Sequence, residues 1–559
     1  MIITSGHSLI RFTVTLVALA ALTLVGVAAM VARPTVAEAA PFASTVEDEG
    51  ADCPVPNLGS LPSNSRLPDP FRKIDGTRIT SKAEWRCRRA EIRELAERYV
   101  YGDKPGKPQS VTGTVTSSSI TVNVSHNGRS ASFSASVQLP TTGSAPYPAV
   151  IVVGGFGADT ATIRASGAAV INYDPMAVGR EGTPRNNKQG AFYTIYGSQS
   201  STGLLAAWAW GASRIIDVIE QSGGNILRAD IGVTGCSRYG KGAFVIGAFD
   251  QRIALTMPIE SGSAGVGAFR AIAQESGAQP LSSAYGEQPW LGDAFSQFTS
   301  NPNALPIDTH QVVGMIAPRG LFIMDNPHIA WLGARPASVA ALGGAEIYRA
   351  LGVPENITYW SEVQDGTHCA SRSEWRTPLQ QHIQKYLLGT GNAPGTMRIA
   401  GSAAGNLAQW RDWTTPTLAD GPSSPPPPPP SSESPSAPPP PPPPSTTAPP
   451  PPPPSTTAPP PPPAGCTATT SVDQWPGGFV ITVRVTAGSS PISGWTVTAT
   501  LPAGASVINS WSSERSGSSG TIVFTNAPWN GTVGAGQTTE FGFQGTGTGT
   551  GTTVTCSAR

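Results

Sequence analysis

A proline tract divides this chain of 559 residues and limits what can fold together. From about Gly421 to Pro463 the sequence consists of proline runs separated by Ser and Thr, and the segment Ser-Thr-Thr-Ala-Pro starts at Ser445 and again at Ser455. This composition cannot bury a hydrophobic core. It favours a polyproline II spacer of roughly 3 Å per residue, with a reach on the order of 100 Å. We therefore expect a Pro/Ser/Thr linker over residues 420–463, with folded parts on both sides of it.

The first forty residues have the pattern of an export signal. A nearly continuous apolar run from Phe12 to Ala32 follows Arg11, and Ala-Glu-Ala at 37–39 offers a cleavage site of small residues. The run is also long enough to span a bilayer, so a retained anchor is the alternative. Because the small-residue site favours cleavage, we expect a signal peptide over residues 1–40, a secreted extracellular protein, and no membrane attachment after signal removal.

Charge and cysteine content narrow the class of partner and the compartment. The 36 basic residues balance 36 acidic ones, so nothing in the composition favours nucleic acid or an anionic membrane. An even number of cysteines suits disulfides in an oxidising compartment, and the lack of any Cys-x-x-Cys pair argues against a zinc site. Spacing alone leaves fifteen pairings. The cysteines are Cys53, Cys87, Cys236, Cys369, Cys466 and Cys556.

The segment after the linker, residues 464–559, is expected to be an all-β module. It has few charges and much Thr, Ser and Gly, and apolar and polar residues alternate at 478–486 and 494–500. Short alternating runs of this kind indicate a β-sandwich of about a hundred residues. Cys466 and Cys556 bracket the module, which favours a disulfide between its first and last strands that would offset the small core by roughly 3–4 kcal/mol.

Residues 45–415, before the linker, alternate strand-like and helix-like segments. Alternating residues at 111–139 indicate an antiparallel edge, and helical spacing occurs at 203–221 and 241–249. Strands that alternate with helices predict a doubly wound α/β sheet of the α/β-hydrolase type, with right-handed crossovers. Short apolar runs of the kind buried in a parallel sheet lie at 149–153, 168–171, 231–234, 253–257 and 320–324.

Ser237 is the candidate nucleophile, in a Gly-Cys-Ser-Arg-Tyr-Gly segment over residues 235–240. The segment follows a strand-like run and precedes a helical one, which is the setting of the nucleophile elbow of α/β-hydrolases. Glycines flank the serine where a sharp strand-to-helix turn needs residues without side chains. The spacing is Gly-x-Ser-x-x-Gly instead of Gly-x-Ser-x-Gly, so a serine in an ordinary turn is the alternative.

A serine nucleophile needs a histidine base, which an acidic residue orients. Three histidines follow the elbow outside the helical tail, in the chain order that such hydrolases use: His310, His328 and His368. His368 lies in a loop that begins at Asp365, directly after a strand-like run at 357–363, so it is favoured as the base. His310 and His328 are expected near the same sheet edge, lining the cleft without a role in the chemistry.

Two carboxylates compete for the role of the acid. Glu260 ends the strand after the elbow helix and so would lie at the same sheet edge as Ser237, whereas Asp325 ends the later strand at 320–324. The later strand is nearer to where such folds usually keep the acid. Either residue could also be a helix cap or a surface carboxylate, and spacing leaves both open.

Two cysteines strengthen the choice of nucleophile and base. Cys236 directly precedes Ser237, and Cys369 directly follows His368. A disulfide between these cysteines would hold the serine and the histidine close enough to hydrogen-bond, because bonded cysteines have Cα atoms about 5.5–6 Å apart.

Four motifs within roughly Leu67 to Leu388 carry a resemblance to a known enzyme family. They are Asp75-Gly-Thr-Arg-Ile-Thr-Ser-Lys-Ala-Glu-Trp-Arg-Cys-Arg-Arg89, Trp208-Ala-Trp-Gly-Ala-Ser-Arg214, Gly235-Cys-Ser-Arg-Tyr-Gly-Lys-Gly-Ala243 and Ile316-Ala-Pro-Arg-Gly-Leu-Phe322. The segment resembles the glucuronoyl esterases of carbohydrate esterase family 15. Members of that family cleave the ester that joins 4-O-methyl-glucuronic acid side chains of xylan to lignin alcohols. They use neither a metal nor an organic cofactor, so none is expected here.

The resemblance assigns catalytic roles residue by residue. It implies that Ser237 is the nucleophile, His368 the base and Glu260 the acid. Some bacterial members place this carboxylate elsewhere, so Asp325 stays the alternative. Arg238 would stabilise the oxyanion together with backbone N–H groups, because an arginine stays charged and presents several donors. The implied mechanism is two-step acyl transfer through a covalent ester on the serine.

The resemblance also implies a substrate site and a set of disulfides. Four residues match positions that contact the glucuronoyl sugar in the family: Lys241, Gln279, Glu287 and Trp331. The implied disulfides are Cys53–Cys87 and Cys236–Cys369. A monomer is expected.

The last module resembles the cellulose-binding modules of family 2, with the motif Gln-Trp-Pro-Gly-Gly-Phe at 474–479 and Asn-Ala-Pro-Trp-Asn at 526–530. The resemblance implies that Trp495 is buried and that three other tryptophans form an exposed strip that stacks on glucose rings. Exposed tryptophans are unfavourable in a small domain unless they bind something. The tryptophans of this strip are Trp475, Trp511 and Trp529.

The sequence therefore predicts a secreted serine esterase that hydrolyses glucuronoxylan–lignin esters and is directed to a cellulose surface by its last module. An acetyl xylan esterase, or another carboxylesterase of the plant cell wall, is the alternative on the same fold. The polar set around Lys241 and Glu287 favours a uronate acyl group over acetate. A binding protein with an inactive hydrolase domain is a further alternative, against which the intact Ser237 and His368 count.

Overall fold

The computed structural model describes residues 44–420 and 465–558, apart from residues 476, 512, 528 and 529. These residues form an N-terminal α/β part and a C-terminal β part. The expected signal peptide, and all but the first residue of the expected linker, lie outside the described residues. No helix in the described parts is long and apolar enough to cross a membrane.

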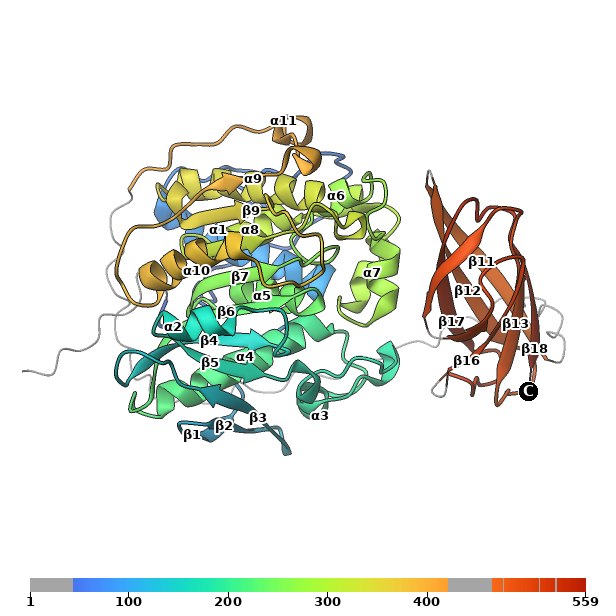
Figure 1. The fold of residues 1–559 in the computed structure, drawn as a ribbon, viewed down its shortest axis with the longest axis horizontal. Helices are drawn as coiled ribbons and strands as arrows, with labels where there is room; N and C mark the ends of the chain where they lie inside the picture. Colours follow the sequence, from blue (N-terminus) through green and yellow to red (C-terminus); the bar gives the residue numbers. More distant parts are fainter. Residues whose placement is uncertain (1–43, 421–464, 476, 512, 528–529, 559) are drawn as a thin grey trace, which may run out of the picture. The chain divides into compact units, whose positions relative to one another are not determined.

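The α/β part is built on a ten-stranded mixed sheet. Its strands, in spatial order, are β1 (Ser110–Val115), β2 (Ser119–His126), β3 (Arg129–Gln138), β5 (Ala169–Tyr173), β4 (Tyr147–Val153), β6 (Leu227–Cys236), β7 (Ile253–Ile259), β8 (Gly320–Met324), β9 (Ile357–Trp360) and β10 (Met397–Arg398) (Figure 1). β1 to β3 pair antiparallel, as the alternation at 111–139 predicts, and β3 is also antiparallel to β5. From β5 to β10 all neighbouring strands are parallel, which confirms the α/β fold class.

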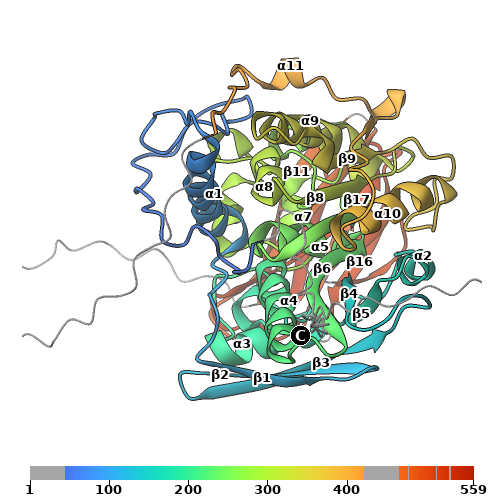
Figure 2. The same cartoon turned by 90° about the vertical axis from the view of Figure 1, so that its left-hand side faces the viewer.

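Helices cover both faces of this sheet, and for that reason its central strands are apolar on both faces. Along β4, Ala149, Ile151 and Val153 pack into one core, whereas Val150 and Val152 pack into the other. The helices on the first face are α1 (Lys82–Ala96), α4 (Leu204–Gln221), α5 (Arg238–Phe249), α8 (Thr309–Ile316) and α9 (Ala334–Ala350), and those on the second are α2 (Thr160–Ala165) and α10 (Ser373–Tyr386) (Figure 2). Shorter helices are α3 (Ala191–Tyr196), α6 (Phe269–Ile272), α7 (Leu281–Glu287) and α11 (Leu407–Trp410).

The parallel strands bring the candidate residues to one edge of the sheet. Ser237 follows β6 directly, Glu260 follows β7 and Asp325 follows β8, while the loop with His368 comes after β9. Parallel neighbours end at the same edge, where ligands bind in open α/β sheets. The edge therefore collects residues that lie far apart in the sequence.

The C-terminal part is a β-sandwich of two four-stranded sheets, as the sequence predicts (Figure 1). One sheet contains β11 (Cys466–Trp475), β12 (Gly478–Ala487), β17 (Thr538–Thr546) and β14 (Ser506–Trp511), and the other contains β15 (Ser513–Ser516), β16 (Thr521–Asn526), β13 (Trp495–Thr500) and β18 (Thr553–Ala558). Trp495 is fully buried between the sheets and its ring stacks on Phe541 with the centroids 4.9 Å apart. Its expected place in the core is confirmed.

Disulfides use all six cysteines, in the pairings that the sequence led us to expect: Cys53–Cys87, Cys236–Cys369 and Cys466–Cys556. The last of these joins β11 to β18, which lie in different sheets of the sandwich. It therefore fastens the first strand of the module to the last.

Candidate active site

The turn around Ser237 is a strained nucleophile elbow. Ser237 has φ 60° and ψ −126°, a conformation that is costly for a residue with a side chain, and its N–H donates to the carbonyl of Ile259 at 2.9 Å. A Cβ on Gly235 would lie 2.6 Å from the Tyr239 carbonyl oxygen, and one on Gly240 would lie 2.4 Å from the Ile259 carbonyl oxygen. The irregular Gly-x-Ser-x-x-Gly spacing thus has a physical reason, because the second glycine lies where α5 passes the end of β7.

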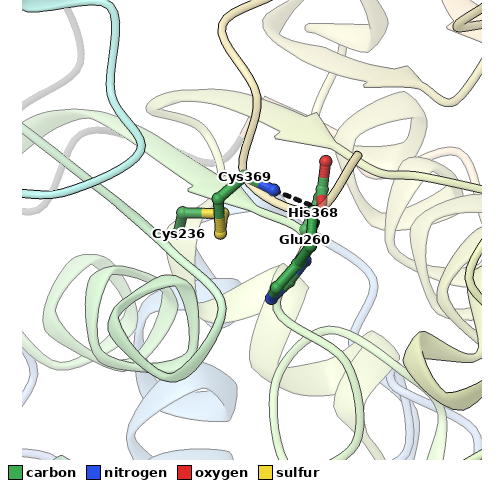
Figure 3. A group of neighbouring side chains, drawn as sticks. All are labelled: Cys236, Glu260, His368 and Cys369. Atoms are coloured by element: carbon green, nitrogen blue, oxygen red, sulfur yellow. Dashed lines mark hydrogen bonds and ion pairs between the residues drawn. A yellow bond between two sulfur atoms is a disulfide. The ribbon is translucent and has the colours of Figure 1, made fainter. Parts of the chain in front are cut away.

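His368 and Glu260 form a short hydrogen bond across the sheet edge (Figure 3). His368 Nδ1 lies 2.6 Å from Glu260 Oε2, and the same oxygen accepts from the backbone N–H of Cys369 at 3.0 Å. The His368 side chain is 29% exposed, while that of Glu260 is fully buried. A neutral imidazole that donates through Nδ1 leaves Nε2 free to accept a proton, as a general base requires.

Glu260 stays ionised although it is buried. Burial alone would raise the pKa of this carboxyl, but hydrogen bonds from His368, from the Cys369 N–H and from Arg372 outweigh it and hold the pKa below its usual value. Arg372 Nη2 donates to Glu260 Oε1 at 2.7 Å, and Asn326 Nδ2 approaches the same oxygen at 3.4 Å. An anion in this position can orient the imidazole and stabilise it once it is protonated.

Asp325, the other candidate acid, is bonded elsewhere. Its Oδ2 accepts from the Tyr359 hydroxyl at 3.1 Å, and its Oδ1 accepts from the Asn326 N–H at 2.9 Å. Burial raises the pKa of Asp325 to about 7, and the charge of Glu260 adds to the effect. The contact with His368 is thus made by Glu260 in this structure.

The other two histidines are placed differently from each other. His328 lies near the His368 loop, with Nε2 at 2.8 Å from the Val363 carbonyl oxygen. His310 is fully buried, its Nε2 lies 2.9 Å from the Pro68 carbonyl oxygen, and burial lowers its pKa to about 4. The expectation that His310 lines the cleft is wrong, because its side of α8 packs into the core.

The disulfide Cys236–Cys369 lies beside this pair and sets the distance between the serine and histidine segments (Figure 3). Its Cα atoms are 5.8 Å apart, within the range that the sequence argument assumed. The two sulfurs lie near Glu260 and His368 in an arrangement that could hold a metal ion. Since each sulfur is bonded to the other, neither is a thiolate ligand, and these donors do not suit a metal.

Three of the four expected sugar-binding residues, Gln279, Glu287 and Trp331, are linked to one another, and Trp331 also contacts His368. Gln279 Nε2 donates to Glu287 Oε2 at 2.8 Å, and the Gln279 N–H donates to the Trp331 carbonyl at 3.0 Å. The Trp331 ring meets His368 edge-on with the centroids 4.9 Å apart. Lys241 is buried and donates to the Ser261 carbonyl at 2.5 Å, and burial lowers its pKa to about 8 against the attraction of Glu287.

Arg238, the expected oxyanion donor, is held by an acidic residue that the sequence did not single out. Its Nη1 lies 2.8 Å from Glu181 Oε2, and Trp290 Nε1 donates to the other oxygen of Glu181 at 2.5 Å. Burial would lower the pKa of Arg238, but Glu181 raises it above its usual value. The arginine therefore stays charged beside Ser237 and has a defined position.

Sequence reasoning also missed the loop that follows β4. It reads Gly154-Gly-Phe-Gly157, and a Cβ on Gly154 would lie 2.4 Å from the Tyr239 ring, while one on Gly157 would lie 2.4 Å from Cys236 Cβ. The loop thus lies against the residues on both sides of Ser237. Its position matches the loop that supplies one oxyanion N–H in α/β-hydrolases, and two glycines after a buried strand are the signal that could have found it.

The structure does not describe the side chains of the expected cellulose-binding tryptophans. Trp475 and Trp511 end β11 and β14, but their side chains are not among the described ones, and Trp529 lies outside the described residues. Their role stays a prediction.

Comparisons with known proteins agree with the fold. The family model described as glucuronyl esterase, fungi, matches residues 122–352, and the one described as cellulose binding domain matches residues 466–558. A 4-O-methyl-glucuronoyl methylesterase of Hypocrea jecorina is 39% identical over 376 residues, which cover 66% of this chain and 80% of that protein.

Solved structures give the same result. The glucuronoyl esterase catalytic domain from Hypocrea jecorina matches with a TM-score of 0.61 at 37% identity, covering 65% of this chain and 100% of that one. A serine-to-alanine variant of the enzyme from Sporotrichum thermophile, in complex with methyl 4-O-methyl-β-D-glucopyranuronate, matches with a TM-score of 0.62 at 36% identity, covering 66% of this chain and 100% of that one. The chain therefore belongs to the glucuronoyl esterases, a family of carboxylic ester hydrolases, and carries a cellulose binding domain at its C-terminal end.

Proposed function

We propose that this protein hydrolyses the ester between 4-O-methyl-glucuronic acid side chains of glucuronoxylan and lignin alcohols, with Ser237, His368 and Glu260 as its catalytic triad. The observation that carries the proposal is the Glu260–His368 hydrogen bond beside a serine held in the elbow conformation. The complex of a relative with a methyl glucuronate ester supports the same acyl group.

In the first step His368 takes the proton of the Ser237 hydroxyl, and the serine oxygen forms a bond to the uronoyl carbonyl carbon. The tetrahedral intermediate collapses when the bond from that carbon to the alcohol oxygen breaks. His368 then gives its proton to the leaving alcohol, which leaves the uronoyl group as an ester on Ser237. Glu260 remains ionised throughout and stabilises the imidazolium that forms in between.

In the second step water replaces the alcohol. His368 takes a proton from the water, whose oxygen bonds to the uronoyl carbon, and the bond to the serine oxygen breaks. His368 returns the proton to Ser237, and the glucuronic acid side chain leaves with a free carboxyl group, still attached to xylan. Arg238 and backbone N–H groups at the elbow would stabilise the negative oxygen in both intermediates, which is the interaction that contributes most to such reactions.

The acyl group is proposed to be a uronate because of the polar residues beyond the elbow. Gln279 is hydrogen-bonded to Glu287 and to the backbone of Trp331, and Glu287 attracts the Lys241 cation. An acetyl group would leave these residues largely unused. An acetyl xylan esterase is the competing function. Rates on benzyl glucuronate and on acetylated xylan, measured with one preparation, separate the two: we expect cleavage of the glucuronate ester, and a clear preference for acetylated xylan would contradict the proposal.

The place of action is proposed to be plant cell wall outside the producing cell. The signal-like residues 1–40 and the three disulfides support export. The cellulose binding domain, with Trp475, Trp511 and Trp529 as its contact strip, would then keep a monomeric esterase near its substrate.

A further inference from the structure

Glu181 lies beside the elbow but has no role in either step of the mechanism. It belongs to the loop between β5 and α3, and its side chain is only 10% exposed. Both of its carboxylate oxygens are bonded, because Oε2 lies 2.8 Å from Arg238 Nη1 and Oε1 accepts from Trp290 Nε1 at 2.5 Å. A carboxylate that is nearly buried is stable only when its oxygens are paired, so these two bonds hold it in place.

Trp290 is the fixed partner of Glu181. It is 2% exposed, and its carbonyl accepts from the Leu205 N–H in the first turn of α4 at 3.1 Å. The Arg238 guanidinium lies over its ring, with the guanidinium carbon 5.9 Å from the ring centroid. A buried ring in a close-packed interior moves little. Trp290 therefore holds one oxygen of Glu181 at a constant place beside the arginine.

The loop that carries Glu181 is also fastened to the segment around α7. The Gly182 N–H donates to Gln288 Oε1 at 2.7 Å. Arg185 donates to the Tyr285 carbonyl at 2.8 Å, and its guanidinium lies 3.8 Å from the centroid of the Tyr285 ring. These contacts fix the backbone directly after Glu181, so the fold holds the carboxylate in position.

Arg238 has more freedom than its partner. Its side chain is 43% exposed, and its ion pair is with Glu181. A half-exposed arginine samples many rotamers, and holding it in one of them costs entropy. An oxyanion donor is effective only when it is in place before the negative charge develops. Arg238 therefore needs a fixed partner that keeps it beside Ser237.

We propose that Glu181 is a positioning residue that holds Arg238 where the negative oxygen of the tetrahedral intermediate forms. The inference rests on the proposed function, in which Arg238 stabilises that oxygen. Glu181 acts on the reaction only through the guanidinium. A carboxylate suits this role because its hydrogen bonds to a cation are shorter and stronger than those between neutral groups. The bond from Trp290 to its other oxygen keeps the carboxylate from following the arginine into solvent.

The test measures kcat and KM for benzyl glucuronate in Glu181→Gln, in Arg238→Met and in the double variant. Glu181→Gln keeps the length of the side chain and can still accept from Trp290, but it loses the negative charge. Since the loss of one oxyanion donor lowers kcat by about 10²–10³-fold, we expect that loss in Arg238→Met and a loss of about tenfold in Glu181→Gln, with KM within about threefold. In the double variant kcat should stay within about twofold of that of Arg238→Met, because the effect of Glu181 needs the arginine.

Glu94→Gln is the matched control. Glu94 pairs with Arg98 at the end of α1, also at 2.8 Å, and the Arg98 side chain is 43% exposed, like that of Arg238. This variant should stay within about twofold of wild type, because exposed ion pairs contribute little.

A kcat of Glu181→Gln within twofold of wild type would overturn the inference. A rise in KM at unchanged kcat would also overturn it, since Glu181 would then act in sugar binding. A full additional loss in the double variant would mean that Glu181 supports the site without the arginine, which is the third contrary result. If Glu181→Gln does not fold, Glu181→Asp is judged by the same outcomes, because its shorter side chain cannot keep both contacts.

Each of these contrary results leaves the proposed function standing as long as the wild-type protein cleaves benzyl glucuronate. A wild-type protein that does not cleave this ester would overturn the proposed function and the inference together.

Discussion

Replacing Arg372 tests how the Glu260 carboxylate is held in place. Its side chain is 1% exposed, donates to Glu260 Oε1 at 2.7 Å, and also donates to the carbonyls of Asp365 at 2.5 Å and Thr367 at 2.8 Å. It therefore joins the acid to the loop that carries His368. Arg372→Met leaves Glu260 buried without its cation, which should lower the free energy of unfolding by roughly 3–5 kcal/mol.

The catalytic effect should be separable from this loss of stability. A shift of the His368 loop by about 1 Å is enough to reduce kcat on the order of 100-fold. Arg372 also helps to hold the pKa of Glu260 below its usual value, so its removal raises that pKa. Since catalysis needs Glu260 ionised, the acid limb of the kcat/KM profile should move to higher pH in Arg372→Met. Arg372→Lys keeps the positive charge but loses the several parallel hydrogen bonds that a guanidinium group makes. We therefore expect kcat to fall, and the acid limb of the pH profile to move less than in Arg372→Met.

The assay is kcat/KM for benzyl glucuronate as a function of pH, measured below the unfolding temperature of each variant. Arg376→Met is the matched control, because Arg376 lies in α10, for which Arg372 is the N-cap residue, is 57% exposed, and pairs with Asp159 only at 3.7 Å. It should stay within about twofold of wild type, as surface ion pairs contribute little. A normal acid limb and a kcat within twofold for Arg372→Met would refute the reasoning, even if that variant unfolds earlier.

Further variants distinguish the role of Asp325 from that of Glu260 and test the cellulose-binding tryptophans. Asp325→Asn should keep kcat/KM within about threefold, because Glu260 orients His368. Glu260→Gln should lower kcat by a factor on the order of 10⁴. A larger loss of activity in Asp325→Asn than in Glu260→Gln would make Asp325 the acid. Burial raises the pKa of Asp325 from 3.8 to about 7, so the wild-type protein should lose stability as the pH rises through this range. Thermal unfolding of Asp325→Asn, compared between the lower and the upper end of this range, should show a smaller loss. Trp511→Ala combined with Trp529→Ala should abolish retention on crystalline cellulose while the rate on a soluble ester stays unchanged, and full retention would contradict the role of these tryptophans.

The sequence was informative where short-range patterns decide the structure. Apolar runs predicted the parallel strands, because a strand covered on both faces must be apolar on both. The elbow could be found from its glycines, since Gly235 and Gly240 lie where backbone leaves no room for a Cβ. Cys236 and Cys369 tied Ser237 to His368 because a disulfide fixes a short distance without any knowledge of the fold.

The choice of acid could not be made from local pattern. Glu260 and Asp325 end adjacent parallel strands, β7 and β8, so both reach the same edge. What separates them is the path of the His368 loop, which depends on Arg372, 112 residues beyond Glu260. The pairing of Arg238 with Glu181, 57 residues earlier, escaped notice for the same reason. Contacts of this range depend on how the strands are ordered, and local sequence patterns do not reveal that order.

The central claim is that Ser237 is the nucleophile of a uronoyl esterase. The direct measurement is the release of free glucuronic acid from benzyl glucuronate by the wild-type protein and by Ser237→Ala, with thermal unfolding as the check on folding. We expect the wild-type protein to release the acid and the variant to lose at least about 10⁴-fold in kcat while unfolding at a similar temperature. A folded Ser237→Ala variant with activity within tenfold of wild type would contradict the account.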